Sequence, residues 1–171
     1  MNVAFITRST LYTVPGGDTV QVEQTARHLQ DINVNANIVL SHQKVDYNKF
    51  DLIHWHIDWL HLPFARCIKT PCVTTLHGRL DLPFMSTMVQ GFAKSRFVSI
   101  SNSQRTPLPD LNWAATVYHG LPANLLSYRA NSAGYLAFLG RFTPEKGPDV
   151  AIRVARARPD AFAHCRQNSA W

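Results

Sequence analysis

Two basic residues, Arg141 and Lys146, flank the predicted start of a helix in the last third of the 171-residue chain. An apolar run over 135–139 precedes them, Thr143 is a candidate helix cap, and Pro144 suits a first helical turn. First turns normally favour acidic residues, so basic side chains at this place indicate a ligand rather than helix stability. Because a helix N-terminus also presents free N–H groups, the pattern predicts that Arg141 and Lys146 bind a diphosphate.

A second candidate site is the pair Gly16-Gly17, which lies between a predicted strand and a predicted helix. Two glycines let the backbone bend sharply and approach a ligand, and the helix behind them favours an anion. Asp18 and Gln21 resemble a capping box for that helix. The chain has neither GxGxxG nor Gly-Lys-Ser/Thr here, so it lacks the dinucleotide fingerprint and the P-loop. An ordinary strand-to-helix turn is the alternative interpretation of the two glycines.

Histidines follow or end several predicted strands. His54 and His56 share one strand face, as in many metal sites, but the sequence specifies no further ligand, and we expect no metal. We expect them to line a crevice at the carboxyl edge of a sheet, where open α/β folds bind ligands. His77 can donate a hydrogen bond to a sugar hydroxyl or stabilise developing charge, and Arg79 adds a fixed positive charge. His119 is a further candidate for the cleft.

The elements that would position these residues alternate between strands and helices, which predicts an α/β fold with a Rossmann-like, doubly wound parallel sheet. Strands are predicted over 2–7, 34–40, 50–56, 72–76, 96–100, 115–118 and 135–139. Helices are predicted over 18–31, 60–68, 83–93, 102–106 (short) and 144–158. Helix capping is enough to explain the serine-rich segment before the short helix.

The pattern divides the chain into four parts. Residues 1–122 form an N-terminal Rossmann-like domain, and 123–134 form a polar linker. Residues 135–158 are the first strand and helix of an incomplete second Rossmann-like domain, and 159–171 are an irregular tail. A lone strand of a parallel sheet has no neighbours to bury it, so the strand over 135–139 is expected to pack on the first domain, pair with another chain or stay loosely ordered, and an exposed edge of this kind favours self-association.

Composition narrows the class of protein. A hydrophobic content of 46% with 16% charged residues is typical of a globular chain. No segment resembles a signal peptide or a membrane span, and three irregularly spaced cysteines favour reduced thiols, so we expect a cytoplasmic protein. The net charge of +6 suggests an anionic partner, which leaves open peripheral contact with the inner face of a membrane. We expect no nucleic-acid binding, because basic and aromatic residues are not interleaved.

Taken in order, the motifs resemble the retaining glycosyltransferases of family 4, which have the GT-B fold. The resemblance rests on six motifs over residues 1 to about 158: PGGD, FDLIHWH, TTLHGRLD, VSISNSQR, TVYHGLP and YLAFLGRFTPEKGPDVAIRVA. It implies an acceptor-side domain followed by a donor-side domain, with a sugar transferred between them from a UDP- or GDP-linked donor. The acceptor would be a saccharide, a lipid-linked compound or another small molecule.

The resemblance also implies roles for particular residues. His77 matches the family's histidine that faces the reacting sugar, and Arg141 and Lys146 match the basic pair that neutralises the leaving diphosphate. Gly17 matches the loop near the donor phosphates or the acceptor, with Gly16 beside it. The family usually needs no metal and no cofactor besides the nucleotide-sugar, which is a substrate.

The chain departs from the family pattern near Pro159. The paired glutamates of the family's donor domain have no counterpart, which implies a truncated glycosyltransferase with little or no activity alone. Family-like sequence in another downstream reading frame is the expected finding, and its absence would count against truncation.

The residues bear on other functional classes as well. A non-catalytic sugar- or phosphate-binding module fits the same glycines and histidines. An NAD-dependent oxidoreductase lacks its glycine fingerprint and acidic ribose ligand. A metal hydrolase built on His54, His56 and Asp58 requires bound metal, and nucleic-acid binding rests on charge alone.

Overall fold

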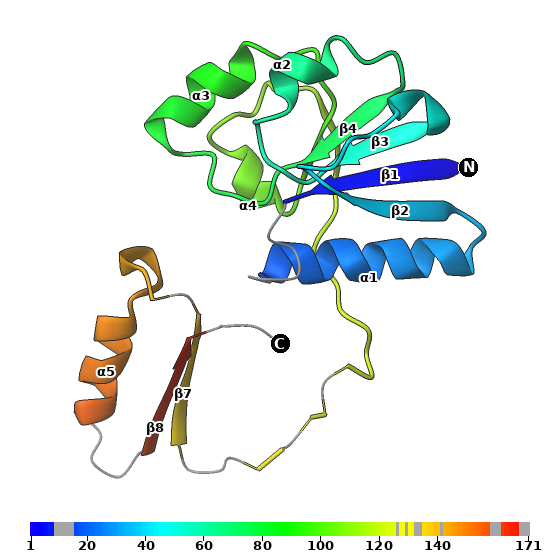
Figure 1. The fold of residues 1–171 in the computed structure, drawn as a ribbon. Helices are drawn as coiled ribbons and strands as arrows, with labels where there is room; N and C mark the ends of the chain where they lie inside the picture. Colours follow the sequence, from blue (N-terminus) through cyan, green and yellow to red (C-terminus); the bar gives the residue numbers. More distant parts are fainter. Residues whose placement is uncertain are drawn as a thin grey trace. The chain divides into compact units, whose positions relative to one another are not determined.

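The computed structural model describes residues 1–8, 16–125, 127–128, 130–131, 135–140, 142–157 and 162–167 (Figure 1). Contacts between residues divide the chain into two compact units, Met1–Leu121 and Pro122–Trp171. The predicted linker, 123–134, falls within the second unit. Over the described ranges, no helix combines the length and the apolar character that a bilayer crossing needs.

The first unit contains a six-stranded sheet in which every neighbouring pair is parallel. Its strand order is β2-β1-β3-β4-β5-β6. The strands are β1 (Asn2–Thr7), β2 (Asn35–Leu40), β3 (Leu52–Trp55), β4 (Cys72–Thr75), β5 (Phe97–Ser99) and β6 (Trp113–Thr116). This order confirms the predicted α/β, doubly wound fold. The predicted strands are present, most of them shorter than predicted, and β6 begins earlier in the chain than predicted.

Helices cover both faces of this sheet (Figure 1). They are α1 (Gly17–Asp31), the 3₁₀ turn η1 (Tyr47–Lys49), α2 (Leu62–Ala65), α3 (Pro83–Gln90) and α4 (Asn102–Arg105). Strand β1 is buried on both sides, as a central parallel strand must be. Its Val3 and Phe5 pack against Val22 of α1, whereas Ala4 and Ile6 belong to a cluster on the other face.

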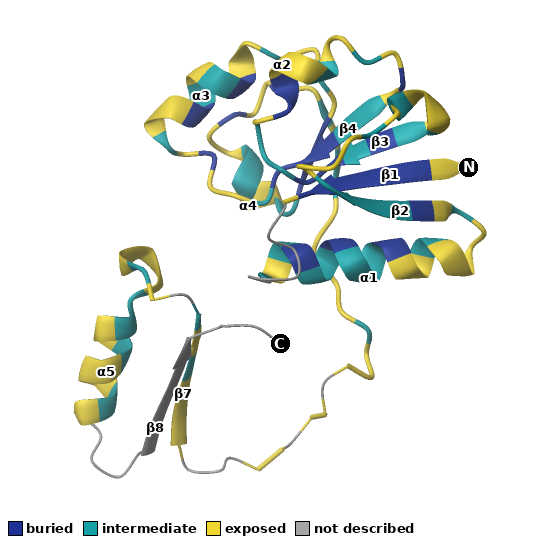
Figure 2. Cartoon of the chain, viewed as in Figure 1, coloured by how far each residue is buried: buried dark blue, intermediate teal, exposed yellow. Residues whose placement is uncertain are grey.

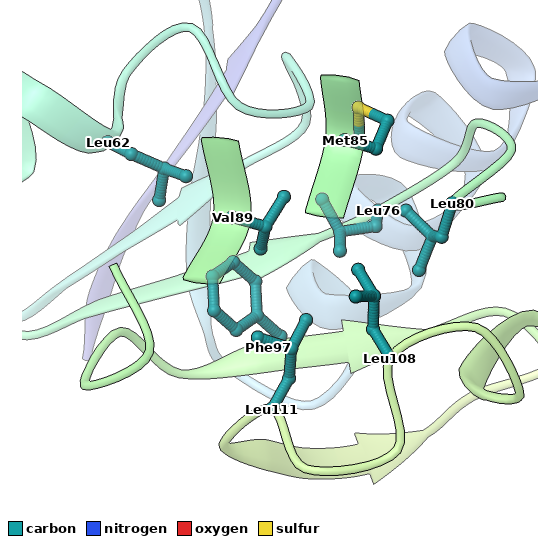
Figure 3. Packing of buried hydrophobic residues seen from close by; sticks show 8 residues of the cluster. All are labelled: Leu62, Leu76, Leu80, Met85, Val89, Phe97, Leu108 and Leu111. Atoms are coloured by element: carbon teal, nitrogen blue, oxygen red, sulfur yellow. The ribbon is translucent and has the colours of Figure 1, made fainter. Parts of the chain in front are cut away.

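The largest buried cluster lies between α2, α3 and the second half of the sheet (Figure 3). Met85 and Val89 of α3 belong to this cluster together with Phe97 of β5 and Leu76, which follows β4. Buried residues lie along the strands and on the sides of the helices that face the sheet, while the outer sides of α2 and α3 are exposed (Figure 2). The core therefore holds the carboxyl ends of β3 and β4 in fixed positions.

Helix α1 begins one residue before the predicted cap. Gly16 is the N-cap, its N–H donates to Thr19 Oγ1 at 2.7 Å, and the Thr19 hydroxyl donates back to the Gly16 carbonyl at 2.7 Å. The predicted capping box of Asp18 and Gln21 is therefore wrong. Asp18 lies in the first turn, where it forms an ion pair with Arg8, and the helix N-terminus favours that negative charge.

The second unit contains a two-stranded parallel sheet and a helix. Its elements are β7 (Tyr135–Gly140), the 3₁₀ turn η2 (Pro144–Lys146), α5 (Pro148–Arg156) and β8 (Phe162–Gln167). The predicted irregular tail is wrong over 162–167, where β8 pairs with β7 along its whole length. The expectation that the strand over 135–139 has no parallel neighbour is therefore also wrong, and the argument for self-association through an unpaired strand loses its basis.

The predicted helix over 144–158 is interrupted. Gly147 has a φ of 65°, a left-handed conformation that separates η2 from α5. Thr143 occupies the N-cap position of η2, but its side chain makes no capping hydrogen bond, contrary to prediction. Pro144 lies in the first turn of η2 as predicted.

Candidate functional site

The strand order of the first unit has a topological switch point beside β1. The chain leaves β1 through α1 to reach β2 on one side, then crosses to β3 on the other side of β1. Open α/β sheets bind ligands outside the carboxyl ends of the strands at such a switch point. Here this place receives the N-terminus of α1 and the residues that follow β3 and β4.

Two predicted histidines meet at this edge. His56 directly follows β3, and its N–H donates to the Ile6 carbonyl of β1 at 2.8 Å. His77 lies just beyond β4, and its Nε2 lies 2.8 Å from Nδ1 of His56. The two rings are stacked, with centroids 5.1 Å apart. The structure therefore brings together two histidines that lie 21 positions apart in the sequence.

His119, which follows β6, extends this pair into a chain of three imidazoles. Its Nε2 lies 3.3 Å from Nδ1 of His77, so His77 is bonded through both ring nitrogens. A neutral imidazole has one N–H and one lone pair, which is what two such neighbours require. The chain runs from His56, which is 7% exposed, to the exposed His119.

The environment favours the neutral form of these rings. Burial lowers the pKa of His56 well below its usual range, and the neighbouring His54, His77 and His119 lower it further. Burial also lowers the pKa of His77, although the carboxylates of Asp18 and Asp58 oppose this effect. At neutral pH His56 and His77 are therefore uncharged groups that can donate or accept a hydrogen bond.

His54 lies beside the chain without joining it. Its ring centroid is 4.1 Å from that of His56, as their shared strand face predicts, and its Nε2 bonds to Thr75 Oγ1 at 2.7 Å. Burial, and then the charge of His77, lower the pKa of His54 to about 4. Over the described ranges, no three His, Cys, Asp or Glu side chains are arranged to hold a metal ion.

The turn that carries His77 is held by two side chains. Gln104 of α4 donates from Nε2 to the carbonyls of Leu76 and Gly78, at 2.9 Å each, and its Oε1 accepts the N–H of Ile100 at 2.8 Å. Asp58 Oδ1 lies 3.4 Å from the N–H of His77. Gln104 therefore ties the residues on both sides of His77 to the neighbouring strand–helix connection.

The N-terminus of α1 is the second part of the site. Among the described residues, no heavy atom beyond the neighbouring backbone lies within 4 Å of the position that a Cβ would take at Gly17. At Gly16 a Cβ would lie 2.7 Å from Asp18 Oδ1, so a side chain there would displace the carboxylate of the Arg8–Asp18 ion pair. The first turn of α1 also carries Asp18, whose charge acts on His77.

The remaining predicted site residues are Arg79, Lys146 and Arg141. Arg79 is exposed and donates two hydrogen bonds to Asp81, from Nε at 2.8 Å and from Nη2 at 2.7 Å. These bonds lower the pKa of Asp81. Lys146 is exposed in η2 of the second unit, and Arg141 lies outside the described residues. Their prediction as a diphosphate-binding pair stays a prediction.

Sequence reasoning missed the role of Gln104. The spacing Ser101 to Gln104 is that of a capping box, and Ser101 Oγ does accept the N–H of Gln104 at 3.1 Å. Capping accounts for the serine, but nothing in the pattern shows that the amide reaches two carbonyls of the β4 turn. Comparison with known proteins adds no assignment, because neither the family models nor the curated proteins include a match to this chain.

Proposed function

We propose that the first unit is the acceptor-side domain of a retaining glycosyltransferase of the family 4 type, which transfers a sugar from a nucleotide-sugar donor to an acceptor. One observation carries the proposal: the uncharged His77 imidazole lies at the carboxyl edge of the sheet, next to the N-terminus of α1. A sugar offers hydroxyl groups, and its leaving group is a diphosphate. A neutral imidazole and a helix N-terminus suit these two chemistries.

The donor side of the proposal rests on the second unit. Lys146, together with Arg141, would neutralise the diphosphate as it leaves. This part is supported by the sequence pattern and by the exposed position of Lys146. No metal or cofactor is part of the proposal, since the nucleotide-sugar is itself the reactive substrate.

We expect the chain alone to transfer little or no sugar. The described part of the second unit supplies a two-stranded sheet and a helix of 9 residues, which is a small framework for a nucleotide-sugar. Product formation with a panel of UDP- and GDP-sugars and saccharide acceptors tests this. Clear turnover would contradict the expected inactivity while supporting the reaction class.

Ligand binding tests the site itself. Titration with nucleotide-sugars and saccharides, followed through the imidazole NMR signals, should shift His77 and leave His42, an exposed histidine outside the site, unchanged. His77→Ala should weaken binding about 3- to 10-fold, the effect of one hydrogen bond to a neutral partner. His42→Ala is the matched control and should bind normally. If no ligand in the panel moves the His77 signal, the proposed site is wrong.

A second candidate function is a non-catalytic sugar- or phosphate-binding module. It is favoured because the first unit alone supplies the residues of the candidate site, which are Gly17, His56, His77 and His119. Such a module would bind a sugar phosphate as well as the corresponding nucleotide-sugar. A transferase domain should prefer the nucleotide-linked compound, so the ratio of the two affinities separates the candidates.

A further inference from the structure

The positive charge of the first unit is concentrated in its second half. Between Asp58 and Asp110 the sequence has only one acidic residue, Asp81, which is bonded to Arg79. The same stretch has six basic residues: Arg66, Lys69, Arg79, Lys94, Arg96 and Arg105. This imbalance gives α2, α3 and their connections a positive potential that the first half of the unit does not share.

Four of these cations line one groove of about 1220 Å³. They are Arg66, Lys69, Lys94 and Arg96. The groove lies at the amino ends of the strands, since its lining includes the first residues of β3 and β4 and the residue that precedes β5. The histidine chain lies at the opposite, carboxyl edge of the same sheet.

No carboxylate neutralises these four side chains within the described residues. The ion pairs found there join Arg8 to Asp18, Arg27 to Glu23, Arg79 to Asp81 and Arg153 to Asp149. Arg66 is nevertheless held in place. Its guanidinium donates to the Gly91 carbonyl and lies over the Phe92 ring, 4.4 Å from the centroid. The groove thus carries four positive charges, of which that of Arg66 is held in place, and its lining also includes the apolar Ile68 and Val73.

Large apolar side chains project from the same segment. Leu60 is 59% exposed, Phe64 of α2 is 70% exposed, and Phe84 of α3 is 51% exposed. Figure 2 shows the exposed outer surfaces of α2 and α3 on the same side of the sheet. Helix α2 contributes both to the exposed apolar side chains and to the groove. Phe64 is exposed, and the next two residues, Ala65 and Arg66, line the groove. Exposed apolar side chains beside uncompensated cations are typical of proteins that lie on an anionic bilayer.

We propose that this face of the first unit, formed by α2, α3 and the groove that the last residues of both helices line, docks on an anionic phospholipid surface. Arg66, Lys69, Lys94 and Arg96 contact the lipid phosphates, and Leu60, Phe64 and Phe84 enter the boundary between headgroups and acyl chains. The apolar side chains favour this occupant over a nucleic acid, whose phosphate backbone gains nothing from an exposed leucine. The proposal is independent of the sugar-transfer site at the other edge of the sheet.

Co-sedimentation of the full chain with vesicles tests the charge. We expect binding to phosphatidylcholine vesicles that contain phosphatidylglycerol, little binding to phosphatidylcholine alone, and weaker binding as salt rises. Lys94→Gln with Arg96→Gln should lower the partition coefficient about 30-fold, since each basic residue near an anionic surface contributes about a five-fold factor. Lys44→Gln with Lys49→Gln removes the same charge from exposed positions outside the groove and should change the partition coefficient by less than about two-fold.

Substitution of Phe64 tests insertion. Phe64→Ser should lower partitioning at least about ten-fold without any change in charge, whereas Ile32→Ser, at an equally exposed position after α1, should not. Equal loss from both charge variants would mean non-specific attraction and would overturn the assignment to the groove. Displacement from vesicles by soluble glycerol phosphate at the same phosphate concentration, or stronger binding to RNA than to vesicles, would overturn the lipid surface as partner. Thermal unfolding of each variant shows that a loss of binding is not a loss of fold.

Discussion

At the scale of single residues, the histidines differ in what their ring nitrogens contact. His61 illustrates the alternative to a functional role. It is 2% exposed, stacks on Trp55 with ring centroids 4.6 Å apart, and its Nε2 bonds to Thr74 Oγ1 at 2.7 Å. His77 instead bonds to His56 and His119 at the carboxyl edge of the sheet. The sequence predicted His56, His77 and His119 at or after strand ends, but only the fold shows that His61 is packed in the core while His77 is half-buried at the sheet edge.

The buried histidines should make stability depend on pH. Burial lowers the pKa of His61 to about 3 and that of His54 to about 4, from 6.5. Because the unfolded chain binds these protons first, stability is fully present above pH 6.5 and is lost as pH falls toward those values. Between the folded and unfolded pKa values, each such histidine lowers the unfolding free energy by about 1.4 kcal/mol for each pH unit of acidification. His61→Gln should therefore reduce the pH dependence of the unfolding free energy by the contribution of one histidine.

Chemical denaturation at a series of pH values below 6.5 measures this slope. His42→Ala, at an exposed position, is the control and should leave it unchanged. The assignment would be wrong if His61→Gln lowered stability by the same amount at every pH, because a packing defect alone does not bind protons.

Gln104 should be a positioning residue for His77. Gln104→Leu leaves the carbonyls of Leu76 and Gly78 and the N–H of Ile100 without their partner, which should cost about 1–3 kcal/mol of unfolding free energy. The imidazole signals of His77 should also shift, and its apparent pKa should change. Ser101→Ala weakens the same short helix by about 1 kcal/mol through loss of its cap but leaves the amide clamp in place. A His77 signal that moves equally in both variants would assign the effect to α4 as a whole.

At the scale of elements, local signals predicted what lies within one strand or helix. Parallel strands that are buried on both faces have continuous apolar sequences, so they could be recognised along the chain. Their alternation with helices then predicted the parallel sheet. The signals failed where an element depends on distant residues. The strand β8 is formed from a segment without a clear period, and its pairing with β7 supplies the order that the segment itself does not encode. The interruption at Gly147 was missed because a glycine inside a helical pattern is often tolerated.

The C-terminal end of α1 offers a test at this scale. Asn33 has a φ of 59°, and the N–H of Val34 donates to the Leu29 carbonyl at 2.9 Å, as in a Schellman motif. Asn33→Gly should maintain or raise stability, whereas Asn33→Ala should lower it by about 1 kcal/mol, because alanine adopts the left-handed conformation at a cost. Urea denaturation of the two variants gives the difference directly. If alanine were as stable as glycine, the left-handed cap would not limit the stability of this helix end.

At the scale of the whole molecule, the two units differ in how much they bury. The first encloses three clusters of buried apolar residues around six strands. In the second, Tyr135 and Leu139 of β7 are exposed, and no described residue of α5 is buried. Two strands and one helix rarely bury enough apolar area for independent stability. The sequence predicted this imbalance, because only one strand and one helix could be recognised after residue 134.

Native-state hydrogen exchange should therefore separate the units. Amides of β1 should exchange only through global unfolding of the first unit, whereas amides of β7, hydrogen-bonded to one parallel partner, should exchange through a far smaller opening free energy. A difference of about 3 kcal/mol corresponds to a protection ratio of more than about 100-fold. Denaturant should accelerate exchange in β1 and have little effect in β7, because the smaller opening exposes less surface. Equal protection and equal denaturant dependence in the two strands would mean that both units unfold together.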